Sequence, residues 1–215
     1  MPIKASASSN SQSTPVSAGS HHAVCYGVVA IGTQPSEKFA PRKKVIILWE
    51  LPHERGDFGD KTNVPRVISK RYTLSLGERA SLKADLQNWR GKPFTPAELS
   101  AFEIDRLIGA NCFLGVVHED RNGRTYANVT SVMPLPKGMA PLKAELPRLY
   151  FNLDEALEHA LVTGTQPVLP DELPEWIKNL CALSEEWQAH VGGSKPISPP
   201  PTASAAPAQD DSVPL

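Results

Sequence analysis

The chain has 215 residues, of which 40% are hydrophobic, so it can bury a sizeable core. Its 21 prolines are too many for compact structure throughout. No apolar run approaches the roughly 18 residues that span a bilayer, and the Ser-rich beginning lacks the apolar segment of a secretory signal. The sequence therefore predicts a cytoplasmic protein without a membrane segment.

The net charge of −1 hides an asymmetry along the chain. Residues 21–143 carry 18 Lys and Arg against 12 Asp and Glu, whereas residues 144–215 carry 3 against 11. A basic body and an acidic extension can each attract a different partner. The alternative interpretation is uneven solvation without a partner.

Composition divides the chain into four parts. The Ser-rich residues 1–20 and the Pro/Ala/Ser-rich residues 193–215 have little to bury, so both are predicted to be disordered. Residues 21–143 are predicted to form the folded domain. Residues 144–192 are predicted to form a helical extension that follows it.

Three strands are predicted in the first half of the folded domain. They are the β-branched runs Val24–Thr33, Lys44–Leu51 and Arg66–Leu74, the last of which alternates apolar and basic residues. The segment His53–Pro65 contains two Gly, two Asp and an Asn, so we predict a long loop there.

Two helices are predicted after these strands. Over residues 77–90 the apolar positions recur at i, i+4 and i+7, which indicates one buried face that ends at Gly91. These positions are Leu82, Leu86 and Trp89. Residues Thr95–Glu98 form a capping box with Pro at the first helical position, so a second, short helix is predicted to begin there.

A β-hairpin is predicted next. The strand-like runs Asn111–Glu119 and Arg124–Met133 flank Asn122-Gly123, which is typical of a type I′ turn. Three strands, a helical insert and a hairpin follow one another in the order of an OB-fold, a five-stranded barrel. We therefore predict a mainly β, α+β fold with an OB-like barrel, although other α+β folds share this order.

The extension is predicted to contain a short edge strand at Leu149–Phe151 and helices at Asp154–Leu161 and Pro174–His190. The last helix carries an apolar stripe with spacings of 4, 3 and 4 residues. The stripe consists of Trp176, Leu180, Leu183 and Trp187. It is interpreted either as packing on the chain's own barrel or as a surface for a partner or a second copy.

No residue pattern indicates catalysis or a bound cofactor. Cys25, Cys112 and Cys181 are odd in number and widely spaced, as expected for buried free thiols in a reducing cytosol. The segments Leu51–Asp60 and His118–Asp120 hold His and carboxylates, but their spacing does not gather metal ligands. Glycine-rich phosphate loops and nucleophile motifs are missing from the sequence. We therefore expect no enzyme activity, no metal and no cofactor.

Basic and aromatic residues are combined in the predicted barrel. Single-stranded nucleic acid is bound by a basic groove and by rings that stack on bases, and an OB-fold uses strands two and three for this purpose. The candidates are Tyr26, Arg42, Lys43, Lys44, Trp49, Arg66, Lys70, Arg71, Tyr72, Arg121, Arg124 and Tyr126. Trp49 and Tyr72 share strand faces with apolar residues, so burial in the core is the competing interpretation for both.

The end of the chain suggests a second binding function. Asp210 and Asp211 precede Pro214 and the terminal Leu215. A terminal carboxylate beside an apolar side chain can enter a basic-rimmed pocket of a partner. The tip is similar to that of bacterial-type single-stranded-DNA-binding proteins, which recruit replication and repair enzymes with it, although Leu215 stands where those proteins usually have an aromatic residue.

Several phrases resemble a family of phage replication-region proteins, regarded as OB-like single-stranded-DNA-binding proteins. They lie in order within residues 24–140. They are Tyr26–Val29, Trp49–Pro52, Ser69–Leu76, Asn88–Phe94, Thr125–Val129 and Pro134–Met139. The resemblance implies a DNA-binding barrel in the host cytoplasm and supplies no agreed set of binding residues.

The favoured hypothesis is non-sequence-specific binding of single-stranded DNA in phage replication or recombination, with recruitment of replication or recombination proteins by the tail. The first alternative is an adaptor that binds only proteins, through the C-terminal helix and the tail. The second is an enzyme with a pocket around His53, Asp57 and Asp60. The sequence leaves open the choice between DNA and RNA and between a monomer and a homo-oligomer.

Overall fold

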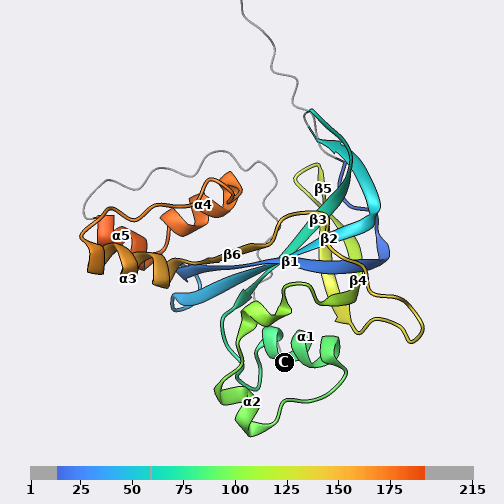
Figure 1. The fold of residues 1–215 in the computed structure, drawn as a ribbon, viewed down its shortest axis with the longest axis horizontal. Coiled ribbons are helices and arrows are strands. Elements are labelled where there is room, and N and C mark those ends of the chain that lie inside the picture. Colours follow the sequence, from blue (N-terminus) through green and yellow to red (C-terminus); the bar gives the residue numbers. More distant parts are fainter. Residues whose placement is uncertain (1–13, 59, 192–215) are drawn as a thin grey trace, which may run out of the picture.

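A curled antiparallel sheet forms the body of the protein (Figure 1). The computed structural model describes residues 14–58 and 60–191, so the predictions made for residues 1–13 and 192–215 lie outside the described residues. Five strands are hydrogen-bonded in the order β3-β2-β1-β4-β5. They are β1 (Gly19–Gln34), β2 (Arg42–Phe58), β3 (Lys61–Thr73), β4 (Asn111–Arg121) and β5 (Arg124–Met133).

The sheet closes only partly, into a half-barrel. β1 pairs with β2 along one edge and with β4 along the other, and its register shifts between Cys25 and Gly27 and again between Ala30 and Thr33. Such irregularities bend a strand and increase its twist. Among the described residues, β3 and β5 lie at the two ends of the hydrogen-bonded order. The fold is thus mainly β and consistent with an OB-like arrangement.

The prediction of a long loop at residues 53–65 is wrong. β2 and β3 instead continue as a hairpin, with Arg55 opposite Pro65 and Phe58 opposite Lys61. Its polar residues hydrogen-bond along the hairpin: Arg55 donates to the backbone oxygen of Asn63 at 2.9 Å, and Asp57 accepts from the N–H of Asn63 at 2.8 Å. The Gly, Asp and Asn content of this segment indicated a loop. The hairpin could not be predicted from that content, because it depends on hydrogen bonds between its two strands.

The elements between β3 and β4 pack against the concave side of the sheet. They are α1 (Ser81–Arg90), α2 (Pro96–Ser100) and the 3-10 helix η1 (Ile104–Leu107). The predicted apolar face of α1 is buried, and the indole N–H of Trp89 donates to the backbone oxygen of Asn111 at 2.8 Å. The capping box at Thr95 and the left-handed Gly91 are both present, as predicted.

The predicted tight turn between β4 and β5 is confirmed. Asn122 and Gly123 both have positive φ, 50° and 73°, and Arg121 pairs with Arg124 across them. A type I′ turn requires positive φ at both central residues, and Asn and Gly tolerate it best.

The C-terminal extension covers the convex side of β1 and β2. It consists of β6 (Leu149–Asn152), α3 (Leu153–Thr163), α4 (Glu175–Ala182) and α5 (Glu185–Val191). β6 pairs in parallel with β1. The helices bury a second apolar cluster against the sheet, the outer apolar cluster, which includes Ile46, Leu48 and Ile177. This arrangement places α3, α4 and α5 together on one side of the sheet (Figure 1).

The single helix predicted at residues 174–190 is two helices in the structure. Leu183 ends α4, and the buried Ser184 separates it from α5. The Ser184 hydroxyl donates to the backbone oxygen of Cys181 at 2.7 Å and accepts from the N–H of Trp187 at 3.2 Å. A serine in this position caps a new helix. The apolar periodicity in the sequence therefore continues although the helix is interrupted at Ser184.

Candidate nucleic-acid interface

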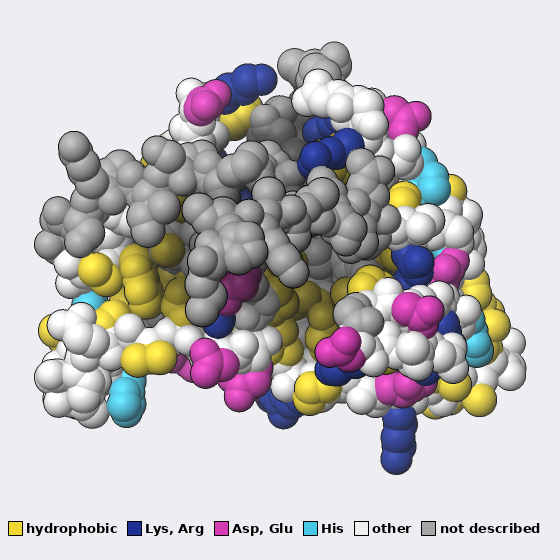
Figure 2. Space-filling model, turned by 90° about the horizontal axis from the view of Figure 1, so that it is seen from above, with side chains coloured by type: hydrophobic (Ala, Val, Ile, Leu, Met, Phe, Trp, Pro, Cys, Tyr) yellow, Lys and Arg dark blue, Asp and Glu magenta, His cyan; other side chains and the backbone are white. Residues whose placement is uncertain are grey.

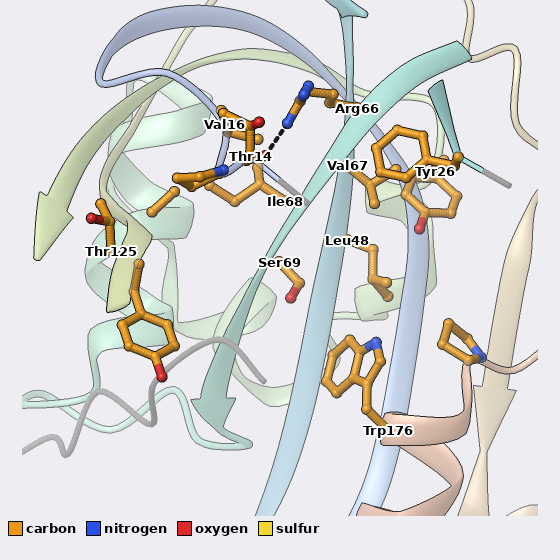
Figure 3. Close-up of a pocket in the computed structure, with 15 residues that line it drawn as sticks. Thr14, Val16, Tyr26, Leu48, Arg66, Val67, Ile68, Ser69, Thr125 and Trp176 are labelled. Carbon is orange, nitrogen blue, oxygen red and sulfur yellow. Dashed lines mark hydrogen bonds between the residues drawn. The ribbon is translucent and has the colours of Figure 1, made fainter. Parts of the chain in front are cut away.

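A groove of about 270 Å³ lies on the outer side of β3 (Figure 3). Its walls come from five parts of the chain: the N-terminal segment, β1, the β2–β3 hairpin, β5 and α4. Its lining includes Tyr26, Arg66, Val67, Ser69, Tyr126 and Trp176. The groove is therefore a product of the tertiary fold.

β3 forms the floor of this groove. Neighbouring strand residues point to opposite faces, so Val67 and Ser69 face outward while Ile68, between them, contributes to the core inside the sheet. Val67 is 45% exposed. The floor therefore offers one apolar and one hydroxyl side chain to a ligand.

Two aromatic side chains lie at the sides of the groove. Tyr126 comes from the start of β5 and Trp176 from the first turn of α4, and both line the groove together with Ser69. Both are half-buried. Rings in this setting keep part of their faces accessible, as stacking on a planar ligand requires.

Arg66 supplies positive charge at the rim. Its guanidinium donates to the backbone oxygen of Thr14 and lies 5.8 Å from the centre of the Phe58 ring. Neither neighbour is a carboxylate, and Arg66 has no ion pair within the described part of the chain. Its charge therefore remains available to an anion.

Comparison with known proteins adds no further assignment. No protein-family model and no curated protein matches this chain. Interpretation of the groove therefore rests on its own side chains and on the sheet that presents them.

Arg71 extends the outer face of β3 beyond the groove. It pairs with Ile46 of β2, which belongs to the outer apolar cluster, and directly opposed residues share one face of a sheet. Burial lowers the pKa of the Arg71 guanidinium from its usual value. An arginine stays charged in proteins even so, and Arg71 has no carboxylate partner among residues 14–58 and 60–191.

Three aromatic candidates are buried rather than exposed. Trp49 is 0% exposed and packs 5.9 Å from the ring of Trp89, and Tyr72 is 1% exposed with its hydroxyl donating to Asp85 at 2.8 Å. Tyr26, which lines the groove, is only 8% exposed, and burial raises the pKa of its phenol. Their predicted role as stacking platforms is therefore replaced by a role in packing, because the apolar faces of these strands are covered.

Three of the basic candidates carry neutralised charges. Carboxylates lie within 2.8 Å of each, and an ion pair reduces the attraction that remains for a phosphate. The pairs are Lys43 with Asp154 at 2.6 Å, Lys70 with Asp85 at 2.8 Å and Arg121 with Glu119 at 2.6 Å. Arg42 and Arg124 are exposed, and Lys44 donates to the Thr73 hydroxyl at 2.8 Å.

The predicted partner stripe on the C-terminal helices is mostly in contact with the barrel. Trp176, Leu180 and Trp187 pack against the outer apolar cluster, whereas Leu183 is 37% exposed. The prediction that these side chains form a partner surface is therefore replaced by the interpretation of packing on the chain's own barrel. Asp210, Asp211, Pro214 and Leu215 lie outside the described residues.

The remaining residue types with reactive chemistry are dispersed or buried. The three cysteines are free and buried, and burial raises the pKa of the Cys25 and Cys181 thiols to about 12. Across the residues that the structure describes, no three His, Cys, Asp or Glu side chains gather as metal ligands, and no helix is long and apolar enough to cross a membrane.

Sequence reasoning missed the role of Trp176 as a wall of the groove. Trp176 follows Tyr126 by 50 positions along the chain, so no local pattern relates the two residues. Ser69 was likewise not a candidate, although its outward direction follows from the alternation along β3.

Proposed function

We propose that this protein binds single-stranded DNA without sequence preference, through the groove on β3 of an OB-like half-barrel. The observation that carries the proposal is that Tyr126 of β5 and Trp176 of α4 line one groove together with Arg66. A base can stack on a ring whatever its identity, and a cation can neutralise a phosphate beside it.

The local arrangement of charge supports this proposal better than the overall charge does. Seen from above, the part of the surface that is not drawn in grey carries hydrophobic side chains together with charged side chains of both signs (Figure 2). A broad basic patch would need more cations free of carboxylates. Arg66, which lines the groove, and Arg71, on the outer face of the same strand, instead carry charges that no carboxylate pairs among the described residues.

The proposal includes a role in phage replication or recombination and recruitment of other replication proteins by the acidic tail. Both rest on the sequence resemblance and on the composition of residues 209–215. The protein-only adaptor is the weaker candidate, because most of the apolar stripe on which it depends packs against the barrel. We propose a non-enzymatic function, since the sequence carries no catalytic motif and no three His, Cys, Asp or Glu side chains gather as metal ligands within residues 14–58 and 60–191.

Fluorescence anisotropy of a labelled oligo-dT of about 30 nucleotides, titrated at several salt concentrations, tests the proposal. The wild-type chain should prefer the single strand to a duplex of equal length. Tyr126→Ala should weaken binding by roughly 5- to 100-fold if one base stacks there. Lys92→Ala, which removes an exposed charge beside the C-terminus of α1, serves as the control and should change affinity little.

Two results would overturn the proposal. The first is no binding at low salt by a protein that unfolds cooperatively and is therefore folded. The second is binding that Arg66→Ala and Tyr126→Ala weaken no more than Lys92→Ala does, since the interface would then lie elsewhere.

A further inference from the structure

A second pocket, of about 360 Å³, lies where β3 ends. It is enclosed by the loop between β1 and β2 and by the segment that connects β3 to α1. Its lining includes Ser36, Phe39, Arg42, Lys44, Ser75 and Arg79. None of its lining residues lines the groove on the outer side of β3.

The lining of this pocket is positively charged. Arg42, Lys44 and Arg79 contribute to it, and its lining includes no Asp or Glu. Arg42 and Arg79 are exposed and have no ion pair within residues 14–58 and 60–191. Two guanidinium groups that no carboxylate of the described residues neutralises, placed around one cavity, form a site for a multiply charged anion.

Hydroxyl groups and a helix terminus add donors to the same pocket. The Ser36 oxygen accepts from the N–H of Phe39 and the Ser75 oxygen from the N–H of Gly77, each at 3.2 Å, so each hydroxyl can donate its proton to a ligand. Ala80, also in the lining, precedes α1 and provides no side-chain cap. The positive end of a helix dipole strengthens the preference for an anion.

An aromatic side chain completes the site. Phe39 lines the pocket and is 48% exposed. An exposed ring beside a basic cavity can stack on a nucleobase whose phosphate the cavity holds. The volume lies at the lower end of the range for small-molecule sites, which suits a single nucleotide unit.

We propose that this pocket binds the phosphate monoester of one nucleotide, with Arg42, Lys44 and Arg79 around the phosphate and Phe39 against the base. The phosphate can belong to a free nucleoside monophosphate or to the 5′-phosphorylated end of a DNA strand. The second source rests on the proposed function, and the first does not.

Isothermal titration calorimetry of the full chain with dTMP, thymidine and inorganic phosphate tests the pocket directly. dTMP should bind, and thymidine, which lacks the phosphate, should bind at least tenfold more weakly. Arg42→Ala combined with Arg79→Ala should raise the dissociation constant for dTMP at least tenfold, and Phe39→Ala should raise it several-fold while leaving phosphate binding unchanged. Lys92→Ala combined with Lys143→Ala removes the same charge outside the pocket and should leave dTMP binding unchanged.

The second arm uses oligo-dT with and without a 5′-phosphate. A preference for the phosphorylated end that disappears in the Arg42→Ala, Arg79→Ala variant assigns the pocket to strand ends. dTMP binding without such a preference assigns it to free nucleotides. The pocket proposal is overturned if the double variant alters neither the affinity for dTMP nor the preference for the 5′-phosphorylated end. This holds even if oligo-dT itself binds through the β3 groove.

Discussion

The buried carboxylate of Glu50 accepts a hydrogen bond from the backbone N–H of Leu146 at 2.8 Å, and from that of Glu145 at 2.9 Å. Glu50 lies in β2 and is 0% exposed, whereas the two N–H groups belong to the segment that leads into β6. A buried carboxylate is tolerated when its oxygens are hydrogen-bonded. Glu50 therefore ties the C-terminal extension to the barrel.

Removing this carboxylate should destabilise the whole chain. Glu50→Ala leaves two N–H groups without their acceptor, so we expect a loss of about 2–4 kcal/mol in the free energy of unfolding, measured by urea denaturation. Glu103→Ala, on an exposed side chain, serves as the control and should cost less than about 1 kcal/mol. A loss for Glu50→Ala as small as that of the control would show that the extension is held by its apolar contacts alone.

Lys70 and Arg71 are adjacent but should behave differently. Lys70 is 11% exposed and paired with Asp85, so Lys70→Ala should lower the free energy of unfolding by about 2 kcal/mol and leave DNA affinity nearly unchanged. Arg71→Ala should instead reduce the slope of log affinity against log salt by about 1. Anisotropy and urea denaturation on both variants provide the measurements. A larger salt effect for Lys70→Ala than for Arg71→Ala would reverse our assignment of the two charges.

Gly32 allows the helices of the extension to approach β1. Its φ is +72°, and a Cβ built there would lie 2.8 Å from the Ser184 Cβ and 2.9 Å from the Leu153 Cδ2. Gly32→Ala should therefore cost about 3 kcal/mol through backbone strain and overpacking together. Gly138→Ala is the matched control, since its φ is +86° with open space around it, and only the strain of about 1 kcal/mol applies. Equal melting temperatures for the two variants would contradict the close packing.

Glu98 should titrate unusually low. The Arg90 guanidinium, with help from the N–H of Thr95, lowers the pKa of the Glu98 carboxyl to about 2 from its usual value near 4.5. Because the folded-state pKa is depressed, the contribution to stability is present above about pH 4.5 and is lost as the pH falls toward 2. Arg90→Ala should raise the pKa of the Glu98 carboxyl, as measured by an NMR titration of its carboxyl carbon. Arg106→Ala should not move it, and a Glu98 midpoint near 4.5 in the wild-type chain would contradict the interaction.

Local chemistry was sufficient to predict several elements. Asn122-Gly123 can adopt positive φ at adjacent positions, so the turn follows from the two residues themselves. The 3.6-residue periodicity of Leu82, Leu86 and Trp89 likewise indicated a buried helix face. The hairpin at residues 53–65 could not be predicted in this way, because it depends on bonds such as that between Arg55 and the oxygen of Asn63.

The candidate site was predicted less completely than the elements. The sequence placed basic and aromatic residues on the strands, and the tertiary structure decided which of them a ligand can reach. Trp49 is covered by α1, Lys70 is paired with Asp85, and Arg71 remains without a carboxylate among the described residues. Burial and ion pairing depend on which distant segment packs against a strand, and a local sequence pattern does not show which segment that is. For the same reason, only the tertiary structure shows that Trp176 and Tyr126 line one groove.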